Sequence, residues 1–237
     1  TGAPLVNKVQ EAYSFLCNNY QAGDEICIFG FSRGAYTARC ISGFIAWAGI
    51  LQNTGADAVS TPAKMGPNGT SDEVGTASVK NTLLAEDGAP LDDEVTVPPQ
   101  VKVLGVWDTV GALGIPGFFP QSKLYQFLDP GLSSNVSYAF QALALGEDRR
   151  DFMPTLWYKP WPSQEEARRK GQVLKQVWFN GAHSSVGGSN EYHGLSDIAL
   201  AWMVAQLLDT HAPEEPLVDV DVAILRSLQD RRYAWAK

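Results

Sequence analysis

A short apolar run that ends in a tight glycine-containing turn constrains the fold of this chain more than any other stretch. Residues 26–29 read Ile-Cys-Ile-Phe, residues 30–34 read Gly-Phe-Ser-Arg-Gly, and a helix-compatible segment begins at Ala35. A strand, a tight turn and a helix in this order are the context in which the serine of a G-x-S-x-G pattern becomes a nucleophile. The sequence therefore predicts an α/β fold in which Ser32 lies in the turn.

The residues on either side of Ser32 have predicted roles in the geometry of the turn and in binding an oxyanion. Gly30 and Gly34 are expected because the turn leaves no room for side chains two positions on either side of the serine. The backbone N–H of Arg33 lies at the head of the following helix, where it would donate a hydrogen bond to a developing oxyanion. A G-x-S-x-G pattern also arises by chance in a chain with 22 glycines. Other parts of the sequence are therefore needed to distinguish a nucleophilic serine from a chance match.

Hydrophobic spacing predicts the elements on either side of this turn. Apolar residues at helical spacing predict a helix over residues 4–20, and a second helix from Ala35 to a glycine C-cap at Gly49. Apolar runs rich in β-branched residues predict strands over residues 101–107 and 173–179.

Further helices are predicted in the second half of the chain. One runs from an N-cap at Ser133 or Ser134 through Leu145, another spans residues 196–208, and a short one covers residues 222–228. The residues expected to face the core are Val136, Phe140, Leu143 and Ala144 in the first of these helices, and Ile198, Ala201, Trp202, Ala205 and Leu208 in the second.

Residues 1–237 are predicted to form a single α/β-hydrolase-like domain, a three-layer sandwich around a mainly parallel sheet. Residues 1–24, before the strand that leads to Ser32, are mostly predicted helix, so we expect the first strand or strands of such a sheet to be missing. Residues 52–98 contain no Trp, Tyr or Phe and are too long for an ordinary connection. We expect a flexible surface insertion there, with a lid or a partner-binding loop as the alternative.

Composition excludes several classes of function. The formal net charge of −8 argues against a general nucleic-acid or anionic-membrane surface. No apolar run reaches the roughly 18 residues of a membrane-spanning helix. The cysteines Cys17, Cys27 and Cys40 are odd in number and lack metal-ligand spacing, which favours a reducing, cytoplasmic compartment; Cys27 is expected to be buried in its strand. No metal or other cofactor is predicted, because no ligand cluster or phosphate-binding loop is present.

Two later strands end in polar residues that complete a set of functional groups. Asp108 directly follows the strand at residues 101–107, and His183 lies shortly after the strand at residues 173–179. Since the carboxyl ends of parallel strands face one crevice, Ser32, Asp108 and His183 are expected to converge. Their order along the chain is that of an α/β-hydrolase. In that arrangement His183 takes the proton from Ser32 Oγ, and Asp108 fixes the imidazole tautomer.

Other residues compete for these roles. His193 lies in a polar loop and His211 lies beyond a helix end, whereas His183 alone follows a strand and is preferred for that reason. The competing acids are Asp148, Asp151 and Asp197. The first two of these belong to a charged cluster whose arginines offer structural ion-pair partners. A strand-end aspartate is also a common turn residue, and a histidine in a glycine-rich loop commonly bonds backbone carbonyls.

Four segments, in order along the chain, carry a resemblance to a known family. They are Phe-Gly-Phe-Ser-Arg-Gly-Ala-Tyr-Thr-Ala-Arg (29–39), Val-Trp-Asp-Thr-Val-Gly (106–111), Glu-Asp-Arg-Arg-Asp-Phe-Met-Pro-Thr-Leu-Trp (147–157), and Gly-Ala-His-Ser-Ser-Val-Gly-Gly (181–188) with Leu-Ser-Asp-Ile-Ala-Leu-Ala-Trp-Met (195–203). These segments resemble the type VI secretion phospholipase-effector catalytic domain, an α/β-hydrolase family with many uncharacterised members. The resemblance implies esterase chemistry on lipid ester bonds, with Ser32, Asp108 and His183 matching the family's serine, aspartate and histidine.

The chain departs from this family at two places. The family usually carries an aspartate at the position of Ser185, a carboxylate that would help to hold the histidine loop. It also opens with an upstream strand that carries an Asp-Gly-Thr segment, which this chain lacks. An α/β-hydrolase takes its second oxyanion N–H from a loop after an earlier strand, so that donor is unassigned.

The sequence leaves three functional hypotheses. The first is a serine ester hydrolase acting on a small-molecule or lipid ester, in keeping with the apolar segment at residues 112–128 beside the predicted site. The second is a catalytically incomplete α/β-hydrolase-like scaffold or interaction module, completed by a partner protein or by a missing N-terminal segment. The third is a thioesterase or a peptidase.

Overall fold

The structure is a computed structural model, and it describes residues 3–50, 99–111, 131–157, 171–209 and 215–221, with Ala223 and Ser227. The predictions for the insertion at 52–98, the apolar segment at 112–128, His211 and most of the 222–228 helix lie outside these residues.

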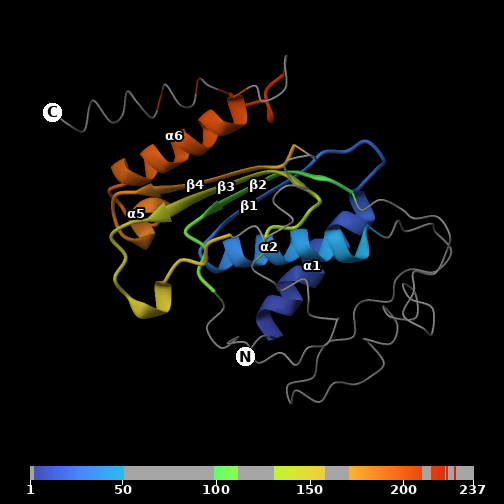
Figure 1. The fold of residues 1–237 in the computed structure, drawn as a ribbon, viewed down its shortest axis with the longest axis horizontal. Helices are drawn as coiled ribbons and strands as arrows, with labels where there is room; N and C mark the ends of the chain where they lie inside the picture. Colours follow the sequence, from blue (N-terminus) through green and yellow to red (C-terminus); the bar gives the residue numbers. More distant parts are fainter. Residues whose placement is uncertain are drawn as a thin grey trace.

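A four-stranded parallel sheet forms the centre of the described fold (Figure 1). Its strands lie side by side in chain order: β1 (Ile26–Phe31), β2 (Val101–Trp107), β3 (Val136–Ala144) and β4 (Val173–Phe179). The strands β2 and β3 are flanked on both sides and are almost wholly buried. Their sequences are accordingly near-continuous apolar runs, as expected for parallel strands covered on both faces.

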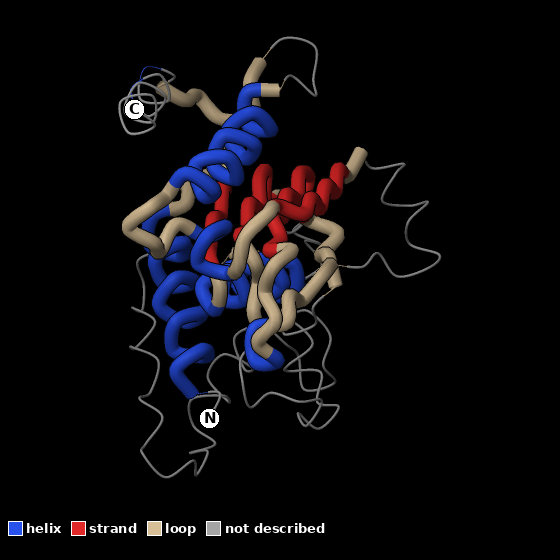
Figure 2. Tube along the Cα trace, turned by 90° about the vertical axis from the view of Figure 1, so that its left-hand side faces the viewer, coloured by secondary structure: helices blue, strands red, loops and turns tan. Residues whose placement is uncertain are grey.

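Helices cover the two faces of this sheet and make a three-layer sandwich (Figures 1 and 2). Helices α1 (Ala3–Asn19) and α2 (Arg33–Ala48) lie on one face, and α6 (Gly194–Leu208) lies on the other. The short helix α5 (His183–Gly187) follows β4 at the carboxyl end of the sheet. The predicted α/β fold is confirmed, as are the strands at 101–107 and 173–179 and the two N-terminal helices, of which α2 ends at Gly49 as expected.

Separate apolar clusters fill the two interfaces between layers. On the α1–α2 face, Ile45 packs with Leu104 and Ala139 of the central strands. On the α6 face, Met203 packs with Val103 and Phe140. Burial of these side chains on both faces supplies the main driving force for the sandwich.

The prediction of a helix from Ser133 or Ser134 through Leu145 is wrong, because this segment contains strand β3. Phe140, Leu143 and Ala144 are buried, as predicted, but in the middle of the sheet. A short apolar run that is buried on both faces has no periodicity to separate a strand from a helix, and pairing with β2 and β4 decided the outcome.

Two predictions of burial are also wrong. In α6 the buried apolar residues are Ala199, Met203, Val204 and Leu207, whereas Ile198, Ala201 and Ala205 are exposed. Apolar residues occur on every side of this helix, so spacing could not select the inward face; Trp202, predicted to be inward, does contact Phe140 and Phe179. Cys27 is exposed, because in the described part of the chain one face of β1 remains partly uncovered.

Candidate active site

Ser32 occupies a strained turn between β1 and α2. Its backbone dihedrals are φ 58° and ψ −125°, and among the described non-glycine residues only Ser32 and Asp108 have positive φ. Such a conformation costs on the order of 1–3 kcal/mol and persists only when the surroundings enforce it. Here the Ser32 N–H donates to the Trp107 carbonyl at 3.0 Å, and the Ser32 carbonyl accepts from the N–H of Tyr36 at 3.2 Å.

The two glycines of the turn differ in the space that surrounds them. A Cβ atom at Gly30 would lie 2.5 Å from the carbonyl oxygen of Gly34, so a side chain cannot be accommodated there. At Gly34 itself, no described atom would lie within 4 Å of such a Cβ atom. The predicted lack of room is therefore correct for Gly30 and wrong for Gly34.

Asp108 follows β2 directly and is fully buried. Its backbone N–H donates to the carbonyl of Ala142 at 2.7 Å, and its Oδ1 accepts from the N–H of Ala144 at 2.9 Å. Both partners belong to β3, so the neighbouring strand fixes this carboxylate in position. The second carboxylate oxygen, Oδ2, lies 2.6 Å from Nδ1 of His183.

His183 is the first residue of α5 and is 4% exposed. Its Nε2 lies 2.7 Å from Oγ of Ser32, so the structure brings all three predicted residues together in one hydrogen-bonded chain. The imidazole is flanked by two aromatic rings, with centroids 4.7 Å away for Phe31 and 5.0 Å away for Phe152. These contacts limit the rotation of the imidazole about its side-chain bonds.

The competing residues lie elsewhere. His193 precedes α6, where its exposed ring is 2.8 Å from Oδ2 of Asp197, an ion-pair geometry within one helical turn. Asp148 and Asp151 are exposed. No hydrogen bond described in the structure joins any of these competing residues to Ser32.

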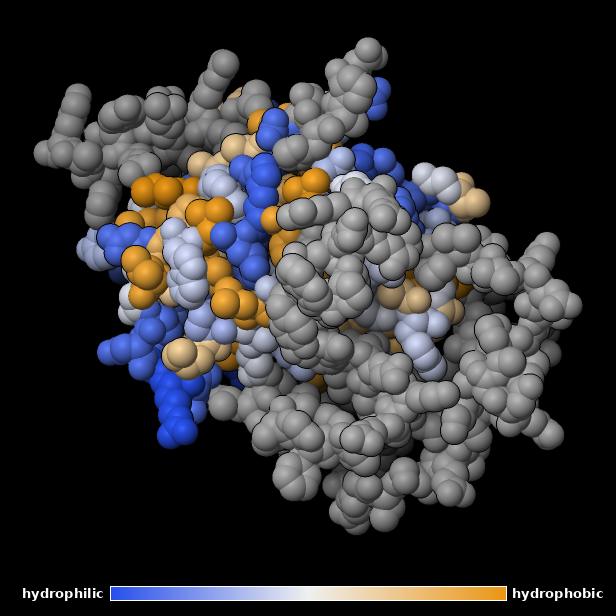
Figure 3. Space-filling view, viewed as in Figure 1, coloured by the Kyte–Doolittle hydropathy of each residue, from blue (hydrophilic) through white to orange (hydrophobic). Residues whose placement is uncertain are grey.

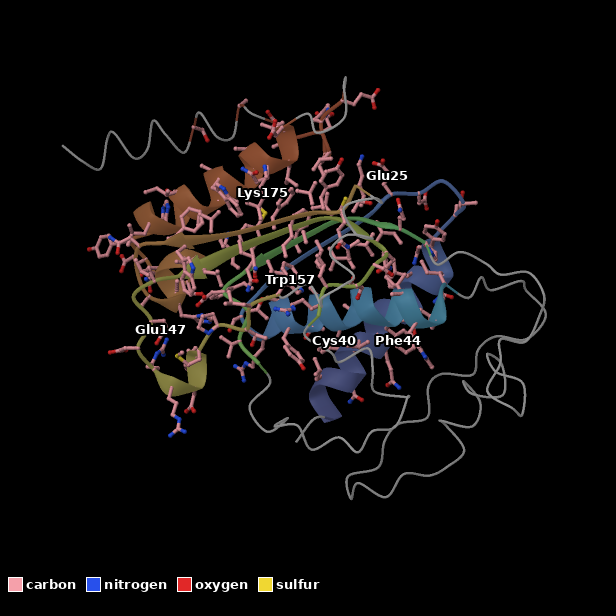
Figure 4. All side chains as sticks on the ribbon, in the orientation of Figure 1. Glu25, Cys40, Phe44, Glu147, Trp157 and Lys175 are labelled. Carbon is pink, nitrogen blue, oxygen red and sulfur yellow. The ribbon has the colours of Figure 1, made fainter. Side chains whose placement is uncertain are left out.

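Residues 153–157 form a strap that begins beside the loop after Asp108 and runs between the sheet and α2 to Trp157 (Figure 4), a position that the sequence did not predict. Arg39 of α2 donates to the Thr155 carbonyl at 2.6 Å and lies over the Trp157 ring at 4.7 Å. The amide of Gln176 bonds both the N–H and the carbonyl of Trp157, at 2.8 and 3.0 Å. The N–H of Thr155 donates to the carbonyl of Thr109, so the strap also holds the loop that follows Asp108.

Glu147 is the second feature that the sequence did not assign to the site. Its side chain is 2% exposed and accepts hydrogen bonds from the Arg149 guanidinium and from the backbone N–H of His183. The guanidinium of Arg149 is the main reason that the pKa of Glu147 falls to about 2. The charged cluster was expected to hold ion pairs, but its link to His183 depends on how the turns after β3 and β4 meet.

Exposed apolar side chains gather near this end of the molecule. Figure 3 shows hydrophobic surface over the region of α5, α6 and the carboxyl end of β4, interrupted by hydrophilic side chains. The large hydrophobic residues exposed in this region include Leu145, Trp178, Tyr192, Leu195 and Ile198.

The described residues lack two further features. They contain no group of three or more His, Cys, Asp or Glu side chains arranged to hold a metal ion. None of their helices combines the length and apolar character needed to cross a bilayer.

The fold and this site define an α/β protein in which a partly buried serine meets a buried histidine and a buried aspartate at the carboxyl ends of parallel strands. Residues 1–206 match the family model described as T6SS, Phospholipase effector Tle1-like, catalytic domain. The chain belongs to this family, and the predicted resemblance is confirmed. Membership of a phospholipase effector family supports lipid-hydrolase function.

Two individual proteins are similar to this chain, one over a short region and the other at low sequence identity. The chain is similar to the uncharacterized protein YEL023C of Saccharomyces cerevisiae, with 47% identity over 47 residues, which are 20% of this chain and 7% of that protein. It is also similar to an uncharacterized protein from Pseudomonas aeruginosa whose crystal structure is known, with 19% identity and a TM-score of 0.38. That match covers 95% of this chain and 30% of the other, so this chain spans under a third of the solved chain's length.

Proposed function

We propose that this chain is a serine hydrolase that cleaves carboxylic ester bonds of lipids through an acyl-enzyme. Ser32 is the nucleophile, His183 is the general base and acid, and Asp108 orients the imidazole. The observation that carries this proposal is the continuous hydrogen-bonded chain from Ser32 Oγ through His183 to Asp108, at 2.7 and 2.6 Å.

The proposed reaction has two halves. His183 Nε2 accepts the Ser32 proton as Oγ attacks the ester carbonyl carbon, and the same proton then passes to the leaving alcohol as the acyl-enzyme forms. A water molecule next attacks the acyl carbon, gives a proton to His183, and releases the fatty acid when Ser32 recovers that proton. Asp108 stays ionised throughout, because its role is to stabilise the imidazolium and fix its orientation.

The backbone N–H of Arg33 is the proposed oxyanion donor. Arg33 is the first residue of α2, and the N–H groups of a first helical turn have no acceptor within the helix. A donor of this kind typically lowers the barrier by about 2.7–4 kcal/mol. Among the described residues we assign no second donor.

A lipid ester is the proposed substrate class for two reasons. The family is one of phospholipase effectors, and exposed apolar side chains such as Leu145 and Leu195 lie near the end of the molecule that holds His183. A net charge of −8 makes a zwitterionic or neutral lipid surface more compatible than an anionic one.

Labelling with a fluorophosphonate probe tests the chemistry directly. We expect covalent labelling of the wild-type protein and no labelling of the Ser32→Ala variant. Circular dichroism checks that both proteins are folded. A folded wild-type protein that shows no Ser32-dependent labelling contradicts the proposal and favours the catalytically incomplete scaffold.

A substrate panel then tests the lipid assignment. p-Nitrophenyl esters of increasing acyl length, phosphatidylcholine vesicles, a thioester and an amide are compared at equal enzyme concentration. The proposal expects faster hydrolysis of long-chain esters than of short ones. A preference for short acyl chains, thioesters or amides argues against a phospholipase.

A further inference from the structure

Glu147 is a buried carboxylate beside His183 that has no role in the proposed chemical steps. It lies in the turn after β3, at the carboxyl end of the sheet (Figure 4). Its side chain is 2% exposed, and burying a charge is unfavourable unless hydrogen bonds and an opposite charge compensate. The contacts of this carboxylate therefore indicate why it is buried there.

Backbone pairing between the turns after β3 and β4 leads directly to Glu147. The N–H of Leu145 donates to the Phe179 carbonyl at 2.9 Å, and the N–H of Gly146 donates to the Gly181 carbonyl at 2.9 Å. At the next position the direction is reversed, because the Glu147 carboxylate accepts the backbone N–H of His183 at 3.2 Å. The two turns are thus joined at three successive positions, and the last connection ends on His183.

The backbone N–H of His183 needs such an acceptor. His183 is the first residue of α5, so its N–H has no acceptor within the helix, and the residue before it, Ala182, provides no side-chain cap. Glu147 fills this place with a carboxylate. Hydrogen bonds from Arg149 keep the pKa of Glu147 at about 2, so the acceptor is ionised at neutral pH.

Glu147 also reaches the imidazole by a second route. Its two carboxylate oxygens bind Nε and Nη2 of Arg149, each at 2.8 Å. The guanidinium carbon of Arg149 lies 3.8 Å from the centre of the Phe152 ring, and that ring packs edge-on against the His183 ring. The carboxylate therefore restrains both the backbone of His183 and one flank of its ring.

We propose that Glu147 is a positioning residue, which holds His183 so that its ring bonds Asp108 and Ser32 at the same time. This inference rests on the proposed serine hydrolase function. The absence of an aspartate at Ser185 is consistent with it, because here a carboxylate from a neighbouring turn holds the histidine loop. Loss of Glu147 leaves the N–H of His183 without its acceptor and frees Phe152, so the imidazole spends less time aligned with Ser32.

The kinetic test uses Glu147→Gln, which keeps the side-chain size, and Glu147→Ala, which removes the group. Glu25→Gln is the matched control, because Glu25 accepts two hydrogen bonds from Lys102 at 2.6 Å and lies at the opposite end of the sheet (Figure 4). With rates normalised to the folded fraction, we expect kcat to fall about 10–100-fold in both Glu147 variants, the effect of losing a hydrogen bond to a charged group. The KM of both Glu147 variants should stay within about two-fold of the wild-type value, and so should the kcat of Glu25→Gln.

A normalised kcat of Glu147→Gln within about two-fold of wild type would overturn the proposal, as would a rise in KM at unchanged kcat. Either result would make the Glu147–Arg149 pair a stabilising contact only. If Glu147→Ala does not fold, Glu147→Gln alone decides, since it removes the anionic acceptor without opening a cavity.

A measurement without substrate separates this inference from the proposed function. The proton between His183 Nδ1 and Asp108 is expected to give a far-downfield proton NMR signal in the wild-type protein, because the two atoms are 2.6 Å apart. We expect this signal to be retained in Glu25→Gln and weakened or lost in Glu147→Gln.

The two failures then look different. If the wild-type protein neither hydrolyses esters nor reacts with a fluorophosphonate, the proposed function fails, while the change of the NMR signal in Glu147→Gln still supports positioning. If the signal is absent from the wild type, or unchanged in a folded Glu147→Gln, the positioning role is overturned whatever the activity.

Discussion

The two ends of the parallel sheet each hold a glutamate ion pair, but they use it differently. At the amino end, Glu25 binds Lys102 across β1 and β2, and the Glu25 side chain is 62% exposed. At the carboxyl end, the Glu147 side chain is 2% exposed and its partners include the backbone of His183. An exposed pair contributes little to stability, whereas a buried carboxylate must have every contact satisfied. The comparison shows that the glutamate at the carboxyl end is connected to the backbone of His183, whereas the one at the amino end contacts the side chain of Lys102.

The largest expected effect is on the carboxyl end, through Asp108. Asp108→Asn retains the shape of the residue but allows the wrong imidazole tautomer, so we expect kcat for ester hydrolysis to fall on the order of 10⁴-fold. The unfolding midpoint and circular dichroism check that the variant is folded. A fall of less than about ten-fold would show that Asp108 does not orient His183.

Gly187→Ala is the next largest. A Cβ atom at Gly187 would overlap the ring of Phe31, which packs against His183. We expect a loss of about 1–3 kcal/mol in the free energy of unfolding, as for other overpacked sites, together with a lower kcat. Chemical denaturation measures the first and ester hydrolysis the second.

Gly194→Ala is the control for that substitution. Gly194 begins α6, and no described atom would lie within 4 Å of an added Cβ atom. The free energy of unfolding should be unchanged or up to about 1 kcal/mol higher, because alanine favours a helix. Equal losses at the two glycines would refute the idea that Phe31 fills the space beside Gly187.

A pH series distinguishes the two glutamates. The pKa of Glu147 is about 2 in the folded protein, below the ordinary value of 4.5, so its ionisation stabilises the fold fully above pH 4.5. That stabilisation is lost as the pH falls from 4.5 to about 2, through the folded pKa. We expect Glu147→Gln to have a lower free energy of unfolding than wild type at pH 7, and this difference to shrink in the acidic range.

The exposed pair gives the reference for this series. Glu25→Gln should lower the free energy of unfolding at neutral pH by less than about 1 kcal/mol, as is usual for surface ion pairs. If the Glu147 gap does not shrink between pH 4.5 and 2, the Glu147 carboxylate does not stabilise the fold as an anion.

The effect on stability that is expected at Ser32 is small and has the opposite sign. Ser32→Gly removes the Cβ atom from a backbone with φ 58°, so the fold should become about 1 kcal/mol more stable after the cost of added chain flexibility, while activity is lost. Ser32→Ala keeps the Cβ atom and the strain, and serves as the control. Equal stabilities of these two variants in chemical denaturation would show that Ser32 is not strained.

The sequence predicted the features that depend on local pattern. The turn at Ser32, the strands that precede it and Asp108, and the helices α1 and α2 all have clear signals within a few residues. The convergence of Ser32, Asp108 and His183 followed from one general property, the shared edge of parallel strands.

Features that depend on tertiary pairing could not be predicted from the sequence. The sequence of β3 also fits a helix, because both faces of the strand are covered and its apolar residues show no alternation. The sequence of α6 does not identify its inward side, because the helix carries apolar residues on every side. The contact between Glu147 and His183 joins residues 36 positions apart, and it exists only because β3 and β4 are neighbours. No local pattern contains that information.

The turn that holds Ser32 and the loop that holds Asp108 are bonded directly to each other. Ser32 donates its N–H to the carbonyl of Trp107 and accepts the N–H of Val110 at 3.4 Å, so backbone atoms connect the two on both sides of Asp108. Both bonds join backbone atoms, so they do not require a particular side chain at Trp107 or Val110. During divergence, such a unit can be inherited whole while the parts of the molecule that meet a substrate change around it, which separates the evolution of specificity from that of reactivity.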